Sequence, residues 1–104
     1  MLLATTDTIC GKNIVKHLGM VRGNTIRARH IGRDIMARLR NVVGGEIGDY
    51  TKLMGESREQ AIDRMVEEAK NLGANAIVGV KFSTAEVMDS AAEILVYGTA
   101  VVVE

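Results

Sequence analysis

Residues 57–82, SREQAIDRMVEEAKNLGANAIVGVKF, determine the fold, because an amphipathic pattern is followed after one glycine by a short apolar run. In the first half, apolar residues recur at steps of three and four, which places them on one side of an α-helix. These residues are Ile62, Met65, Val66, Ala69 and Leu72. The stripe continues upstream in phase through Tyr50, Leu53 and Met54, so we predict one long helix over residues 49–72. Gly55 costs this helix about 1 kcal/mol relative to alanine, and a break at Gly55 is the alternative.

Signals for helix ends flank the stripe. Asp49 is a candidate cap. Ser57 followed by Gln60 also fits a capping box, in which each side chain accepts a hydrogen bond from a backbone amide that has no partner within the helix. Gly73 follows the last turn, where the chain often needs a positive φ that glycine adopts cheaply. Residues 75–82 then predict a strand that is apolar on both faces near its centre, so both faces should be covered. Gly79 in this strand leaves space for close packing.

Three further segments before the long helix have recognisable patterns. Residues 13–21 predict a strand, residues 22–25 (RGNT) a turn, and residues 26–29 a short returning strand. Residues 31–43 carry an apolar stripe at helical spacing and predict a shorter helix, which the glycine pair that follows would end.

The two ends of the chain complete the expected sheet. Residues 1–4 predict an edge strand, and residues 93–103 predict the last strand, after a hairpin tip at Asp89 and Ser90. Gly98 in the middle of the last strand indicates a bulge or close packing. We therefore expect a single α+β domain over residues 1–104, in which a small antiparallel or mixed sheet packs with one long helix and one shorter helix.

Composition points to self-assembly. The chain has 104 residues, of which 47% are apolar and only 3% aromatic, so its core must be built from small aliphatic residues and methionine. A chain of this size has difficulty covering strands that are apolar on both faces. We predict that one face of the last strand lies at a contact between subunits. The residues of that face are Leu95, Tyr97, Val101 and Val103.

Charge is unevenly distributed although the formal net charge is zero. Residues 12–40 carry a net charge of +7 and residues 41–104 a net charge of −6. A basic half could bind nucleic acid, but overall neutrality disfavours a phosphate binder. We favour pairing of the basic half with acidic residues of the same chain or of a neighbouring copy. Arg22, Arg27 and Arg29 are the candidate interface arginines.

Cysteine content and hydropathy bear on the compartment. With one cysteine, Cys10, a disulfide within the chain is excluded, and a reducing, cytoplasmic setting is expected. No apolar run approaches the roughly 18 residues that cross a membrane. The first residues, MLLATTDT, lack the pattern of a signal peptide.

Candidate chemistry is sparse. Soft divalent metals prefer thiolate and imidazole ligands, and the supply here is Cys10, His17 and His30, none of them at ligand spacing from another. A closed ring would repeat each ligand around its axis, which makes metal binding more attainable. Carboxylates near the ends of predicted strands could do acid–base work, but nothing fixes their separation. Residues 44–48 could bind an anion at a helix N-terminus, although a turn between helices is the simpler interpretation. We therefore expect no catalytic residues and no enzyme activity.

Four segments, in this order and spacing, resemble the YbjQ-like family, which is described as "putative heavy-metal-binding" and has no demonstrated activity. The segments are residues 11–23 (GKNIVKHLGMVRG), 34–48 (DIMARLRNVVGGEIG) with Tyr50 after it, 58–80 (REQAIDRMVEEAKNLGANAIVGV) and 97–100 (YGTA). The resemblance implies a subunit similar to the dodecin-like fold, assembled as a ring of five copies. Many relatives have proline before the glycine that matches Gly11, whereas this chain has Cys10, so Cys10 is not carried over as a family metal ligand.

Three classes of function follow. The favoured one is a ring-forming module that binds a divalent heavy-metal ion or a small ligand, with further copies of the same chain as partners and no contact with a membrane. The alternative is a structural or protein-interaction assembly without a metal. An enzyme is the least expected, because the sequence contains no nucleophile elbow, phosphate loop or dinucleotide fingerprint.

Overall fold

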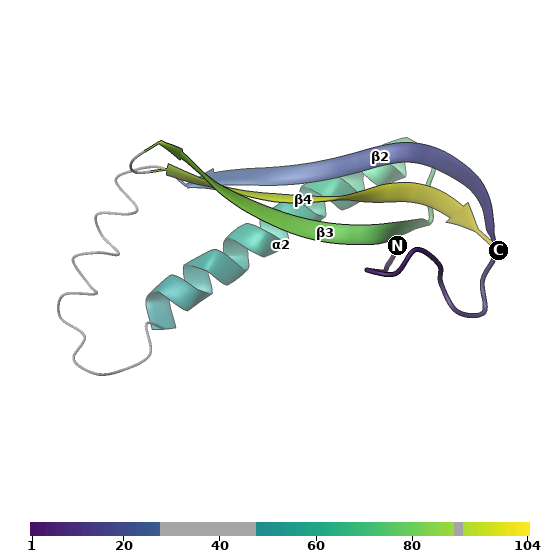
Figure 1. Ribbon diagram of the computed structural model, residues 1–104, viewed down its shortest axis with the longest axis horizontal. Coiled ribbons are helices and arrows are strands. Elements are labelled where there is room, and N and C mark those ends of the chain that lie inside the picture. Colours follow the sequence, from purple (N-terminus) through teal and green to yellow (C-terminus); the bar gives the residue numbers. More distant parts are fainter. Residues whose placement is uncertain (28–47, 89–90) are drawn as a thin grey trace.

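The computed structural model describes residues 1–27, 48–88 and 91–104. In this part of the chain, one helix lies against a sheet of four strands (Figure 1). The elements are β1 (Leu2–Leu3), β2 (Ile14–Arg27), α2 (Gly48–Asn71), β3 (Ala76–Met88) and β4 (Ala91–Val103). No described helix is both long enough and apolar enough to cross a membrane.

The sheet is mixed, as predicted. Its strand order is β1-β3-β4-β2. The short β1 runs parallel to β3, whereas β4 is antiparallel to both of its neighbours, β3 and β2. Met88 of β3 is opposite Ala91 of β4. The connection between these two strands therefore falls at the predicted hairpin tip, whose two residues lie outside the described ones.

The long helix is confirmed nearly residue for residue. We predicted residues 49–72, and α2 covers Gly48–Asn71 without a break at Gly55. Ser57 therefore lies inside the helix and is not a cap; it is fully buried, and its carbonyl oxygen accepts a bond from the Thr25 hydroxyl at 3.3 Å. A small side chain suits this position because the helix approaches the sheet closely here.

The prediction of one long and one shorter helix is wrong for the part of the chain that the structure describes, because these residues contain a single helix. The shorter helix was expected at residues 31–43, which lie outside the described residues. Within the described part, α2 by itself covers the sheet face that carries the main core. The observed fold is thus α+β, with one helix on a mixed four-stranded sheet.

The predicted turn at residues 22–25 is also wrong, because β2 runs continuously from Ile14 to Arg27. Gly23, which was predicted to lie in the turn, is required for a steric reason instead. A Cβ atom added to it would collide with the carbonyl oxygen of Ala61 and would lie 2.6 Å from the amide nitrogen of Met65. Gly23 therefore lets the backbone of α2 approach β2, a use of glycine that a local sequence pattern does not distinguish from a turn.

The main hydrophobic core of the described residues fills the space between α2 and the sheet. The helix contributes its predicted apolar stripe, centred on Met65, and the strands contribute alternate residues. The fully buried members with an exposed fraction of zero are Val21, Ala61, Met65, Ala69, Ile77, Val96 and Ala100. A Cβ atom on Gly98 would lie 2.7 Å from Cγ2 of Ile77, so the predicted close packing at Gly98 is confirmed.

A second cluster lies on the opposite face of the sheet. Successive residues of a strand face opposite sides, and Ala100 belongs to the main core whereas Val101 belongs to this second cluster. Its buried members are Ala76, Val78, Val101 and Val103. Ile9 and Ile14 pack against them, so the chain's own N-terminal segment covers one end of this face.

Gly73 and Gly79 are two of the four described glycines with a positive φ. Gly73 ends α2 with φ of +88°, as predicted for a residue after the last turn. Gly79 has φ of +62° within a register irregularity between β3 and β4. A Cβ on Gly79 would meet only Asp7 Oδ1, at an ordinary 3.7 Å, so this glycine is needed for its backbone angle and not for space.

Candidate functional site

The two described metal-ligand candidates come from neighbouring parts of the chain but from different elements. Cys10 is an exposed free thiol in the segment between β1 and β2. His17 is an exposed residue of β2 opposite Val101, which places it on the sheet face away from α2. His30 lies outside the described residues. In residues 1–27, 48–88 and 91–104, no group of three or more His, Cys, Asp or Glu side chains lies close enough to hold a metal ion.

Thiolate and imidazole are the right chemical types for a soft divalent ion. A tetrahedral structural site needs four such donors. The described part of one copy thus has donors of a suitable kind without a complete donor set.

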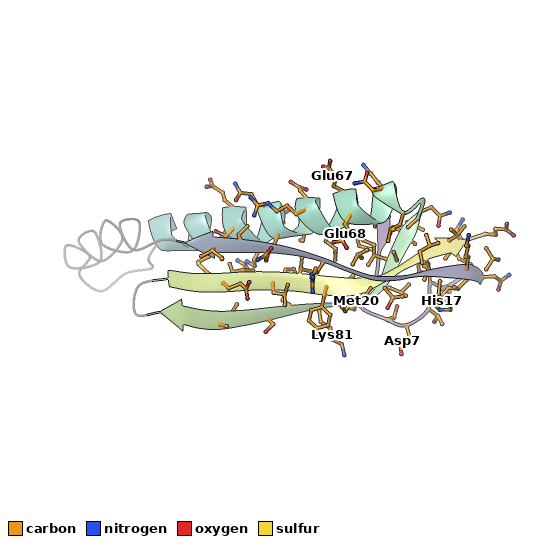
Figure 2. All side chains as sticks on the ribbon, turned by 90° about the horizontal axis from the view of Figure 1, so that it is seen from above. Asp7, His17, Met20, Glu67, Glu68 and Lys81 are labelled. Atoms are coloured by element: carbon orange, nitrogen blue, oxygen red, sulfur yellow. The ribbon has the colours of Figure 1, made fainter. Side chains whose placement is uncertain are left out.

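The sheet face away from α2 carries a second candidate site, which we call the open face. Opposite residues on neighbouring strands share a face, and Tyr97 of β4 is opposite both Arg22 of β2 and Lys81 of β3. Two cationic side chains therefore flank one aromatic ring in a row across three strands. Figure 2 shows Met20 and Lys81 on this side of the sheet, with α2 on the other side.

Large apolar side chains of the open face remain in contact with solvent. Met20 is 65% exposed and Ile26 is 57% exposed. Leu95 and Tyr97 are half-buried. The only acid on the β2 and β4 rows of this face, Glu93, accepts a bond from the Asn24 side chain at 3.0 Å. The open face thus combines exposed apolar side chains with the cations Arg22 and Lys81, and its acid Glu93 is hydrogen-bonded to Asn24, whereas α2 covers the apolar side chains on the other face of the sheet.

The predicted interface residues do not all reach this surface. Arg22, Leu95 and Tyr97 lie on the open face. Val101 and Val103 are buried beneath Ile9 and Ile14 of the same chain, so they add nothing to the exposed surface of this face. The backbone of Arg27 forms the end of β2, and Arg29 lies outside the described residues.

Met20, Ile26 and Lys81 were missed as site residues. The signal was present in the alternation of β2: had residues 14–27 been read as one strand, Met20, Arg22, Asn24 and Ile26 would have been placed on one face. The Gly-Asn pair concealed this pattern by imitating a turn. Lys81 lies near the end of the strand predicted over residues 75–82, where a single polar residue gives no sign of a site.

One outer edge of the sheet is partly closed by α2. Strand β2 has a neighbour on one side only. On its other side, the backbone N–H of Arg22 donates to Glu68 Oε2 at 3.3 Å, and Arg64 Nη1 donates to the carbonyl oxygen of Asn24 at 2.5 Å. These two helix side chains satisfy edge groups that would otherwise be free to pair with another strand.

The model of the YbjQ family, described as "Putative heavy-metal-binding", matches residues 1–104. The chain belongs to the YbjQ family.

YbjQ-family relatives cover essentially the whole chain. A UPF0145 protein of Methanosarcina acetivorans is 61% identical over 101 residues, which are 97% of this chain and 95% of the relative. A UPF0145 protein of Dehalococcoides mccartyi is 57% identical over all 104 residues of both chains. Neither name states an activity, so these relatives establish the family and not a reaction.

A solved structure establishes the fold independently. The crystal structure, at 2.73 Å resolution, of a protein of unknown function of the DUF74 family from Pediococcus pentosaceus is similar, with a TM-score of 0.65. The match covers 100% of this chain and 98% of the other at 18% sequence identity. The arrangement of α2 on the sheet is thus compatible with very different sequences.

Proposed function

We propose that the protein is a ring-forming homo-oligomer, most simply of five copies, that acts as a binding module for a soft divalent metal ion or a small ligand. The observation that carries the proposal is the open face, where Met20 and Ile26 are more than half exposed beside half-buried Leu95 and Tyr97. Contiguous apolar surface of this kind is a recurring mark of interaction sites in small proteins.

Covering the open face with another copy would be favourable. Each square ångström of apolar surface removed from water contributes roughly 25 cal/mol. A contact that uses two different patches on each copy closes into a ring when its rotation allows. The ring of five is taken from the family resemblance.

Light scattering coupled to size-exclusion chromatography tests the assembly. One chain has a mass of 11.2 kDa. We expect a single species at micromolar concentration whose mass is a multiple of this value. A species that remains at the mass of one chain over this range would refute the proposal.

Metal binding is supported by the family description and by the chemistry of the available donors. In this proposal Cys10, His17 and His30 of more than one copy combine, because a ring brings equivalent residues together around its axis. A bound ion would supply a structural cross-link between copies. The protein is not assigned a catalytic role, and its cytoplasmic location stays a prediction from the single cysteine.

Metal titration of untagged, metal-free protein tests this part. We expect Zn²⁺ to bind with a dissociation constant well below about 1 mM and His17→Ala to weaken binding at least tenfold, since one ligand is lost per copy. Cys10→Ser and His30→Ala, titrated alongside, identify which of the other donors take part. If wild-type protein and all three variants show no binding below millimolar Zn²⁺, the metal role is rejected.

The second candidate is a structural or protein-interaction assembly without a metal. The same apolar open face favours it, since coverage of that face requires no ion. One experiment distinguishes the two proposed functions. A ring that forms in the presence of a chelator and binds no soft divalent ion supports the structural assembly.

A further inference from the structure

The open face and the outer side of α2 carry opposite charges, and this bears on how copies would join if the ring proposed above exists. On the open face, Arg22 and Lys81 lie on either side of Tyr97 in one row. Adjacent strands are about 4.8 Å apart. The two basic residues are therefore roughly 10 Å apart across the sheet at the backbone.

The outer side of α2 is acidic. Along the helix, residues at steps of three and four share one side, and this side carries an exposed acidic stripe facing away from the sheet. The residues of the stripe are Glu56, Glu59, Asp63 and Glu67. Figure 2 shows Glu67 on the outer side of the helix, with the sheet on the opposite side.

The helix arginines are turned away from the acidic stripe. Nε of Arg58 donates to the carbonyl oxygen of Met54 at 3.4 Å, and Arg64 reaches the carbonyl oxygen of Asn24 on β2. Both arginines are thus oriented toward backbone oxygens. One exposed cation, Lys70, follows Glu67 in the last turn on the same side of the helix, so the four acids give the stripe a net negative charge ahead of a basic end. Half-buried Ile62 and Val66 lie beside it and add apolar area.

The spacings of the two surfaces match. Residues seven apart in an α-helix are about 10.5 Å apart along its axis. Glu56 and Asp63 have this separation, which equals the estimated distance between Arg22 and Lys81 within the accuracy of both figures. A helix crossing the strands of the open face could therefore place one carboxylate near each cation.

We infer that the acidic stripe of α2 in one copy docks on the open face of the next copy. The contact joins two different surfaces of the same chain, so each copy both offers a stripe and receives one, which is the arrangement that closes into rings. Apolar burial of Met20, Leu95 and Tyr97 supplies affinity, and the charges fix the register and exclude the reversed contact.

Charge reversal on either surface tests this contact. The face variant is Arg22→Glu with Lys81→Glu, and the stripe variant is Glu56→Lys with Asp63→Lys. Each should raise the concentration at which half of the assembly dissociates by at least about tenfold, because like charges then meet across the contact. The variant that combines all four changes should return to within a few-fold of the wild type. All four side chains are exposed, so circular dichroism should show unchanged folding in every variant.

A control matched to the face variant carries the same change in net charge elsewhere. Lys12 and Lys16 are exposed and lie outside both surfaces, so Lys12→Glu with Lys16→Glu should leave assembly unchanged.

Four results would overturn the inference. If the wild type assembles and the face and stripe variants assemble equally well, the contact is wrong while the proposed ring stands. If the single-surface variants dissociate but the combined variant does not recover, the specific pairing is wrong. If the open face instead binds a labelled single-stranded oligonucleotide, and the face variant loses that binding without a change in assembly, nucleic acid is the occupant. A wild-type protein that stays monomeric rejects the ring itself.

Discussion

At the scale of single residues, Gly23 and Gly55 differ in whether the structure has space for a side chain at that position. Gly23 lies under α2, where an added methyl group would collide with helix backbone, whereas Gly55 lies in the helix with open space at its Cβ position. The same substitution should therefore have opposite effects at the two sites. We expect Gly23→Ala to lower the free energy of unfolding by roughly 1–3 kcal/mol, because backbone cannot move aside as a flexible side chain can.

Gly55→Ala is the matched control, and it should raise the free energy of unfolding by about 0.5–1 kcal/mol through the better helix propensity of alanine. Urea denaturation followed by circular dichroism measures both values. A neutral Gly23→Ala variant would show that the helix approaches β2 less closely than described.

At the scale of elements, amphipathic periodicity predicted the long helix correctly, whereas the residue types typical of turns predicted a turn that does not exist. The apolar stripe gave α2 to within one residue at each end. The last strand also alternates as expected: the predicted face of Leu95 and Tyr97 points away from α2, and the residues between, Ile94, Val96 and Ala100, lie in the main core. Both predictions succeeded because the periodicity of apolar residues along a single helix or strand is enough to show which of its faces is buried.

The failures depend on contacts between elements. Arg22, Gly23 and Asn24 look like a turn to any local pattern, because nothing in the sequence says that a helix over thirty residues later will press on this glycine. The composition of the open face likewise depended on knowing that β2 is continuous. Metal donors could be enumerated from sequence, but whether they converge depends on the arrangement of the elements and on further copies.

The closed edge of β2 supports a prediction at this scale. Removing the Glu68 carboxylate leaves the Arg22 amide to water, so Glu68→Ala should accelerate hydrogen exchange of that amide several-fold. Glu68→Gln keeps an acceptor oxygen and should preserve most of the protection. Exchange measured by NMR at the Arg22 amide distinguishes them. Equal protection in the wild type and in Glu68→Ala would show that the edge is closed by something else.

At the scale of the whole molecule, two methionines distinguish the core from the open face. Met65 is fully buried between α2 and the sheet, and Met20 is 65% exposed on the open face. We expect Met65→Ala to lower the free energy of unfolding by about 2–5 kcal/mol at any protein concentration, because it leaves a cavity.

Met20→Ala should change stability by no more than about 0.5 kcal/mol at concentrations where single chains dominate. It should be destabilising at higher concentrations, where assembly contributes to stability by mass action. Thermal unfolding over a range of protein concentrations provides the measurement. A concentration-independent effect of Met20→Ala would contradict a role for this side chain between copies.

The position of β2 in the sheet has a consequence for biosynthesis. Its neighbour in the sheet is β4, which follows α2 and β3 in the sequence, so β2 is synthesised long before its hydrogen-bonding partner. During that interval α2 can already form, and Glu68 and Arg64 can reach one edge of the waiting strand. The opposite edge stays unpaired until β4 has been translated, so the nascent chain exposes to unwanted strand pairing an edge of β2 that the folded chain covers.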